Sequence, residues 1–498
     1  MKLPRLAPLL AAALAVLSAH VLAAQPQPQI RRATMMFPSA QHPQAAMEHF
    51  AAGQHDMDFG NPVSAREHFA MAVQADPAFA FAYLQLAENA NSLDEFRANL
   101  ERAEANAAQA TPAERLLIQM ARKDLDNDVQ GELTLAQQLV AAQPNTPRAL
   151  MELARVQALL GREEDARATL RQATQAAAQF APALMTLANQ YLAEPRDLPK
   201  AEEAIRVAVA AAPDESYVYD VQGDVFRMQG QLEAARAAYT RSAQLAPREG
   251  SPLQQRGHVN SFLGRYDQAR ADYETAAALG RGNEKATYPV WRALVSVHQG
   301  NPRAAVEELD RLVASIDGMN VPDPLGSKIF ALETEAVVAL HANLLDAAGR
   351  AVTQRNQLAA SEAEGSGSAN FRRRAEANAA YWEGMLAARR GDYAAAGEAY
   401  RRYMTAVEPL SDPRKAEAAH ELMGMIELLQ QHYAQAAAHF EHADPNDPYA
   451  TYHRALALDG AGRADEARRL FQRVAEYHFN NAGIALVQKD AVRRAETP

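Results

Sequence analysis

The sequence predicts an all-α fold built from repeated antiparallel helical hairpins. The prediction rests on a pattern that recurs every 34 residues, on small and aromatic residues at fixed places within that pattern, and on Gly or Pro where helices must end. The chain has 498 residues, of which 48% are hydrophobic and 22% are charged, as in ordinary folded proteins. An array of repeats suits this length, because such arrays grow by stacking units.

The clearest repeat spans residues 216–247, and the next one begins at Gly250, 34 residues after the first. Within the first repeat, Gly223 and Ala235 are small at the places where two helices must approach each other closely. Tyr239 supplies a large side chain that fills the space against the first helix. Each hairpin alone would expose an apolar face, and stacking the hairpins buries it.

This set of residues resembles the tetratricopeptide repeat family, whose unit of 34 residues carries Gly, Ala, an aromatic residue, Ala and Pro at these offsets. The resemblance implies a right-handed α-solenoid of about 12 units. A helix at Ala482 to Ala495 is expected to cap the stack. The units are expected to start near residues 46, 79, 113, 147, 182, 216, 250, 286, 329, 377, 417 and 448.

Two longer spacings interrupt the array. Residues 316–328 contain two Pro and two Gly, and residues 359–371 contain a flexible Gly-Ser-Gly-Ser run. Both are expected to be inserted loops, either as tolerated surface insertions or as a binding lip or hinge. They divide the array into a first block at residues 46–315 and a second block at residues 329–495.

Residues 1–24 have the three parts of a bacterial secretory signal. A short positive region precedes an apolar stretch at residues 6–17, and cleavage is expected near Ala23 or Ala24. An uncleaved membrane anchor is the alternative, which the Pro and polar residues within the segment disfavour. Residues 25–45 are rich in Pro and Gln and are expected to form a flexible linker. The mature chain is therefore expected to be periplasmic or secreted.

The formal net charge of −11 makes the chain a poor partner for nucleic acid or for an anionic bilayer. No later segment is apolar enough to predict an integral membrane span. The absence of cysteine excludes disulfides, thiol nucleophiles and thiolate zinc sites. The HExxH, GxSxG and GxxxxGK signatures are absent as well, so neither catalysis nor a cofactor is expected.

The resemblance implies that ligands bind on the concave side of the stack, at first-helix positions one turn apart that the packing does not use. An acidic ladder beside a Tyr in the central units would suit a basic or peptide-like partner, although a solvated helix face is the alternative for each residue. The lysine–asparagine pair with which some members of the family grip a terminal carboxylate is absent at the matching positions. The candidate positions are Tyr217, Asp220, Asp224, Arg227, Gln254 and His258, and upstream Arg148, Arg155 and Gln190.

Two groups of residues resemble metal sites only in part, and no metal is expected. Asp124, Asp126 and Asp128 alternate as in a calcium loop, but the Gly and the bidentate Glu of that loop are missing. An acidic turn in which Asp128 caps the next helix is the favoured interpretation. His439 and His442 stand one turn apart, but their spacing indicates no third ligand for zinc.

The leading hypothesis is therefore an exported scaffold or adaptor that binds a protein or peptide partner in its concave groove and has no catalytic activity of its own. One alternative is a structural component of a periplasmic envelope assembly, such as a polysaccharide-export machine. The other is a carbohydrate-binding or enzymatic protein that uses aromatic side chains, such as Tyr217, Tyr381, Trp382, Tyr449 and Tyr452.

Overall fold

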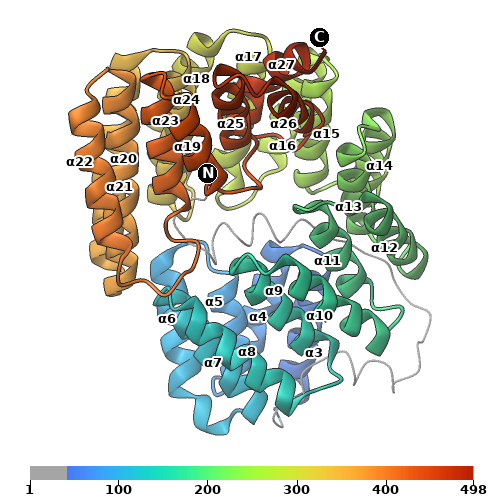
Figure 1. Cartoon of the computed structure of the whole chain (residues 1–498). Helices are drawn as coiled ribbons and strands as arrows, with labels where there is room; N and C mark the ends of the chain where they lie inside the picture. The colour runs from blue at the N-terminus through green and yellow to red at the C-terminus, as the bar shows by residue number, and fades with distance from the viewer. Residues whose placement is uncertain (1–41, 497–498) are drawn as a thin grey trace. The chain divides into compact units, whose positions relative to one another are not determined.

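The computed structural model describes residues 42–496, and every regular element in this range is a helix (Figure 1). The predicted all-α solenoid of antiparallel helical hairpins is confirmed. None of the described helices is long and apolar enough to cross a membrane. The predicted secretory signal at residues 1–24 lies outside the described residues, as does most of the predicted linker at residues 25–45.

The described helices form twelve hairpins followed by one more helix, α27 (Ala482–Glu496). The first helices of the hairpins are α3 (Gln44–Asp58), α5 (Ala80–Glu88), α7 (Pro112–Leu125), α9 (Pro147–Leu159), α11 (Ala181–Leu192), α13 (Ser216–Met228), α15 (Ser251–Phe262), α17 (Glu284–His298), α19 (Pro324–His341), α21 (Ala369–Arg389), α23 (Glu417–Leu429) and α25 (Pro448–Gly460). The second helices are α4 (Pro62–Ala75), α6 (Leu93–Ala105), α8 (Val129–Ala142), α10 (Glu163–Ala176), α12 (Leu198–Ala211), α14 (Leu232–Leu245), α16 (Tyr266–Leu279), α18 (Pro302–Ser315), α20 (Leu345–Gly365), α22 (Tyr393–Val407), α24 (Tyr433–Glu441) and α26 (Ala464–Ala475).

A close approach of glycine and an aromatic ring holds the two helices of a hairpin together. A Cβ atom added to Gly53 would lie 2.7 Å from the ring of Phe69, and one added to Gly223 would lie 2.5 Å from the ring of Tyr239. Both rings are fully buried. The small residue of the repeat pattern is therefore required because the aromatic side chain of the second helix occupies the space of its missing side chain.

The predicted loop at residues 359–371 is wrong, because most of this stretch is helical. Helix α20 continues to Gly365 and α21 already begins at Ala369, so only Ser366 to Ser368 interrupt the helices. The flanking residues are rich in Ala, Glu and Arg, which favour helix. Gly367 adopts the left-handed φ of +70°, and the Ser368 hydroxyl accepts from the Phe371 N–H to cap α21.

The predicted loop at residues 316–328 is shorter than expected. A 3₁₀ turn, η2 (Ile316–Met319), follows α18 directly, and α19 begins at Pro324. The unit starts expected near residues 329 and 377 also lie too far along the chain, because α19 begins at Pro324 and α21 begins at Ala369. Asp323 ends the loop as the N-cap of α19, since its carboxylate accepts from the Gly326 N–H at 2.8 Å.

The described chain packs as two compact units. The N-terminal unit comprises residues 42–226 and 233–252, and the C-terminal unit comprises residues 227–232 and 253–496. This division differs from the predicted blocks, 46–315 and 329–495. The stretch at residues 316–328 does not separate two cores, because its Ile316 and Val321 belong to the same buried cluster as residues before and after it.

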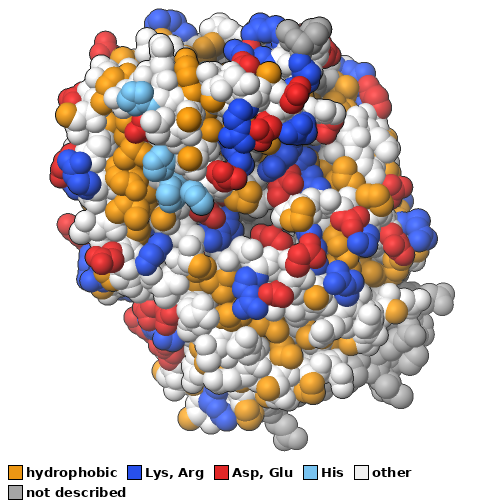
Figure 2. Space-filling view, viewed as in Figure 1, with side chains coloured by type: hydrophobic (Ala, Val, Ile, Leu, Met, Phe, Trp, Pro, Cys, Tyr) orange, Lys and Arg blue, Asp and Glu red, His pale blue; other side chains and the backbone are white. Residues whose placement is uncertain are grey.

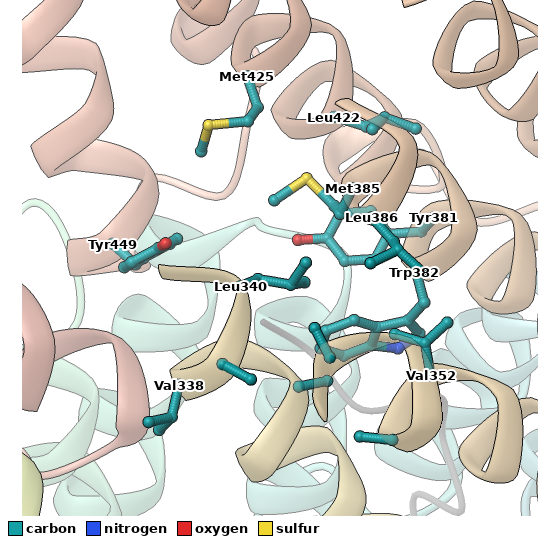
Figure 3. Close-up of a cluster of buried hydrophobic side chains, with 14 of the residues drawn as sticks. Val338, Leu340, Val352, Tyr381, Trp382, Met385, Leu386, Leu422, Met425 and Tyr449 are labelled. Carbon is teal, nitrogen blue, oxygen red and sulfur yellow. The ribbon is translucent and has the colours of Figure 1, made fainter. Parts of the chain in front are cut away.

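The core of the C-terminal unit is a continuous cluster of buried apolar side chains. Figure 3 shows part of it, where side chains from α19, α20, α21, α23 and α25 converge. Trp382 is the largest of these fully packed side chains and is 2% exposed. Because hairpins far apart in sequence contribute to one cluster, this unit holds together through stacking and not through any single hairpin.

Candidate functional site

The residues predicted on α13 lie buried in the structure. Asp224 is 4% exposed and accepts a hydrogen bond from the Tyr239 hydroxyl at 2.6 Å. The next hairpin repeats this contact 34 positions later, where Nδ1 of His258 lies 2.6 Å from the Tyr273 hydroxyl. A tyrosine at the packing position brings a hydroxyl into the core, and that hydroxyl needs a polar partner. The expectation that packing leaves these positions unused is therefore wrong for Asp224 and His258.

The other predicted residues of this region are enclosed to different degrees. Tyr217, Asp220 and Arg227 are between 1% and 7% exposed, whereas Gln254 is partly exposed and lies 3.0 Å from the His258 ring. That these residues bind a ligand stays a prediction. Because Tyr217, Asp220 and Arg227 are buried, a ligand could reach them only by displacing the contacts that they make within the protein.

The predicted residues on α9 and α11 are more accessible. Arg148 of α9 pairs with Asp58 of α3 through both carboxylate oxygens, at 2.8 and 2.5 Å, and its guanidinium lies 5.2 Å from the centre of the Phe180 ring. Asp58 and Arg148 are 90 positions apart, so the first helices of distant hairpins face each other across a narrow inner face. Gln190 of α11 donates to Glu163.

Arg155 of α9 is the centre of a cluster of carboxylates that we name the acidic edge. Its guanidinium contacts Glu132 at 2.5 Å and Glu152 at 3.0 Å. Glu88 and Asp124 complete the acidic edge through their charges. Five residues thus combine four carboxyl groups with one cation.

Two carboxyl groups of the acidic edge have strongly raised pKa values. Burial, together with the charge of Glu152, raises the pKa of Glu88 to about 8. Burial raises the pKa of Glu132 to about 7, although Arg155 opposes the rise, and Oε2 of Glu132 is buried without a hydrogen-bond partner. A cation placed here would lower both pKa values and would gain strong electrostatic attraction.

The position of the acidic edge adds to this attraction. Glu88 and Asp124 stand at the carboxyl ends of α5 and α7, and Arg155 lies in the last turn and a half of α9. Carboxyl ends of helices carry a partial negative charge, which also favours a cation. The sequence pattern indicated Arg155 but not Glu88, Glu132 or Glu152. The available signal was that acidic residues recur near the ends of consecutive first helices.

The two metal-like groups make contacts within the protein. Asp128 caps α8 by accepting from the Gly131 N–H at 2.9 Å, as predicted, and it pairs with Lys123 at 2.7 Å. His420 joins His439 and His442, and the Nδ1 atoms of His420 and His439 are 3.2 Å apart. Figure 2 shows histidine side chains gathered on one face of the molecule. Within residues 42–496, however, no three such side chains are arranged to hold a metal ion.

A cleft of 540 Å³ lies between α7 and α8 of the N-terminal unit, and residues from the end of α6 complete its wall. Among its cations, Arg122 pairs with Glu104 and Lys123 pairs with Asp128, while Arg115 donates to the Ala110 carbonyl. The apolar part of the wall comes from Ile118 and Leu135.

Residues 133–182 and 256–320 match the tetratricopeptide repeat family model. No curated protein matches the chain. Among solved structures, a tetratricopeptide repeat protein from Parabacteroides merdae is similar at 15% identity and a TM-score of 0.34, over 56% of this chain and 95% of that one. The Cut9–Hcn1 hetero-tetramer of the APC/C is similar at 17% identity and a TM-score of 0.41, over 86% of this chain and 76% of that one. Yeast Tom70 is similar at 12% identity and a TM-score of 0.37, over 91% of this chain and 95% of that one.

Proposed function

This chain carries tetratricopeptide repeats, and we propose that it is an exported scaffold that binds a basic segment of a protein partner on the acidic edge of its N-terminal unit, without catalysis of its own. The secretory pattern of residues 1–24 supports export to the periplasm or beyond. The observation that carries the proposal is the convergence of four carboxyl groups and three helix carboxyl ends around Arg155.

The chemistry of the acidic edge favours a Lys or Arg side chain over other ligands. Glu88 holds its proton at neutral pH because burial and Glu152 raise its pKa. A cationic side chain would favour the ionised form, so binding would release this proton. Arg155 already shows that a guanidinium fits between Glu132 and Glu152.

A binding experiment with the mature chain, residues 25–498, tests the proposal. The partner is captured from an envelope extract, and its basic segment is then measured as a labelled peptide by fluorescence anisotropy. The double variant Glu88→Gln/Glu152→Gln should lose about tenfold in affinity, because two charge contacts of modest strength are removed. The control Glu398→Gln/Asp465→Asn removes two exposed carboxylates from second helices and should bind as the wild type does.

The pH dependence gives an independent readout of the same site. Affinity should rise as the pH increases from about 6 to about 8.5, because the released proton of Glu88 makes binding more favourable at higher pH. The Glu88→Gln variant should lose the upper part of this dependence, around pH 8, and keep the part near pH 7 that Glu132 contributes. Equal affinity of the wild type and the double variant, or a peptide without Lys or Arg that binds as well, would refute the proposal.

A further inference from the structure

The inner face of the C-terminal unit is covered by its own last described helix, α27. Helix α27 packs against α17, α19 and α25, which are all first helices, as well as against its neighbour α26. First helices line the inner face of each hairpin stack. Residues 477–496, which we call the tail, therefore lie on the surface that a partner would use in an open stack.

The irregular start of the tail is held by polar side chains of the opening hairpins of this unit. Oδ1 of Asn480 lies 2.9 Å from Nε2 of His298, and its Nδ2 lies 3.1 Å from Nδ1 of His258. Burial lowers the pKa of His298 to about 4 and holds the pKa of His258 well below its ordinary value, so both rings are neutral. In this arrangement His298 donates to the amide oxygen, and Nδ1 of His258 is an acceptor that the amide nitrogen shares with the closer Tyr273 hydroxyl. The amide is thus recognised at both ends.

Two further contacts fix the tail on either side of Asn480. The ring of Phe479 lies 4.2 Å from the guanidinium of Arg227, which is 1% exposed and also donates to Gln255 at 3.0 Å. On α27, Nζ of Lys489 donates to the His298 carbonyl at 2.6 Å. These contacts span separations of up to 252 positions in the sequence, from Arg227 to Phe479.

The helical part of the tail presents a narrow apolar stripe to the unit. Its buried residues include Ile484, Val487 and Ala491, which follow helical spacing, while Lys489 and Arg493 lie on the opposite side. Gly483 lets α27 approach α25 closely, since an added Cβ would lie 2.8 Å from Cβ of Tyr449. An amphipathic helix that lays its apolar side into a groove is a mode by which proteins bind segments of other proteins.

We propose that the inner face of the C-terminal unit is a second protein-binding groove, which the tail occupies as an intramolecular ligand until a partner segment of the same chemistry displaces it. The partner segment carries an aromatic residue and an Asn ahead of an amphipathic helix with a Lys. Within the described residues, the tail is connected to the rest of the unit through the irregular residues 477–481, which follow α26 and precede α27. This proposal does not rest on the acidic edge, which belongs to the other unit.

The test uses the full chain with a loosened tail. The variant Asn480→Ala/Lys489→Ala removes the amide contacts and the contact to the His298 carbonyl. The matched control is Arg493→Ala, whose side chain on the same helix is 76% exposed. Hydrogen exchange reports whether residues 482–496 are released, and a labelled synthetic peptide of residues 476–496 is the probe for the groove.

We expect hydrogen exchange in α27 to be faster in the double variant than in the wild type or the control. The double variant should also bind the peptide at least about tenfold more tightly than either of them, a difference of roughly 1.4 kcal/mol. An unlabelled peptide with Asn480→Ala should compete poorly. Released exchange without peptide binding would overturn the proposal. Exchange that accelerates equally in α17, α19 and α27 would overturn it too, because the tail would then be part of the core.

A cleavable version of the full chain guards against a variant that fails to fold. A protease site inserted between Glu476 and Tyr477 allows the tail to be cut after folding. A cut tail that exchanges with the labelled peptide would support the groove. A cut tail that stays in place against excess peptide would overturn the proposal.

Discussion

Glu333 and Glu335 stand two positions apart on α19, and both are buried. The guanidinium of Arg355 pairs with Glu333 at 2.8 Å and opposes the rise in its pKa that burial causes. Glu335 lacks a guanidinium at this distance, and burial together with the charge of Asp310 raises its pKa to about 8. The two carboxyl groups should therefore respond in opposite ways to replacement by Gln.

Glu335→Gln should stabilise the fold at high pH. The folded-state pKa of Glu335 lies above its ordinary value of 4.5, so its contribution to stability is full below pH 4.5 and is lost as the pH rises through about 8. The variant should gain roughly 1–3 kcal/mol at about pH 9 and little at pH 4.5. Glu333→Gln should instead lose about 3 kcal/mol, because it leaves Arg355 buried without its counter-charge. Urea unfolding at both pH values measures this, and a gain for Glu335→Gln at low pH as large as at high pH would contradict the assignment.

At the same scale, the sequence predicted the helix on which some candidate residues lie and misjudged the burial of others. Arg148 and Arg155 lie on α9 as the repeat pattern predicts, because first-helix periodicity fixes which side of the helix a residue takes. The burial of Asp224 and His258 depends on the hydroxyl groups of Tyr239 and Tyr273, which lie on the partner helix. The acidic edge needed three hairpins to be stacked, and such a long-range arrangement is invisible in any single repeat.

Glycine within a helix lowers the free energy of unfolding relative to alanine, except where a neighbouring side chain occupies the space of the missing Cβ atom. The hairpins contain one glycine of each kind. Gly223→Ala of α13 should destabilise the N-terminal unit by about 1–3 kcal/mol, because the added Cβ would lie 2.5 Å from the Tyr239 ring. Gly397→Ala of α22 should stabilise the C-terminal unit by about 0.5–1 kcal/mol, because the nearest atom to its Cβ would be 3.9 Å away. Thermal unfolding of both variants compares them. A stabilising Gly223→Ala would show that the ring moves aside without cost.

Elements of ordinary repeat length were predictable because each carries its own small and aromatic residues and its own terminators. The lengths of α20 and α21 were not predictable, since both helices have 21 residues, whereas helices of a regular unit, such as α14 and α16, have 14. The Gly-Ser run between them suggested a flexible loop, yet a left-handed Gly367 and a capping Ser368 need only three residues to reverse the chain. Glycine and serine mark a tight helix connection as readily as a linker.

At the scale of the whole molecule, the two compact units differ from the two predicted blocks, for which composition was the only guide. Residues 316–328 look like a boundary by their Pro and Gly content, but Ile316 and Val321 lie in the core of the C-terminal unit. The actual division falls among residues 227–252, where the repeat pattern is strongest. Repeat regularity describes how a hairpin packs internally and gives no signal about where one compact unit ends.

If the two units are separate in stability as well as in packing, a cavity in one should leave the other intact. Trp382→Ala removes the largest side chain from the C-terminal core and should cost that unit about 3–5 kcal/mol. Phe69→Ala is the corresponding change in the N-terminal unit, where the ring is fully buried against Gly53. Native-state hydrogen exchange should show lost protection in residues 284–496 for Trp382→Ala and in residues 44–211 for Phe69→Ala. Protection lost evenly along the chain in both variants would mean that the described hairpins unfold as one cooperative stack.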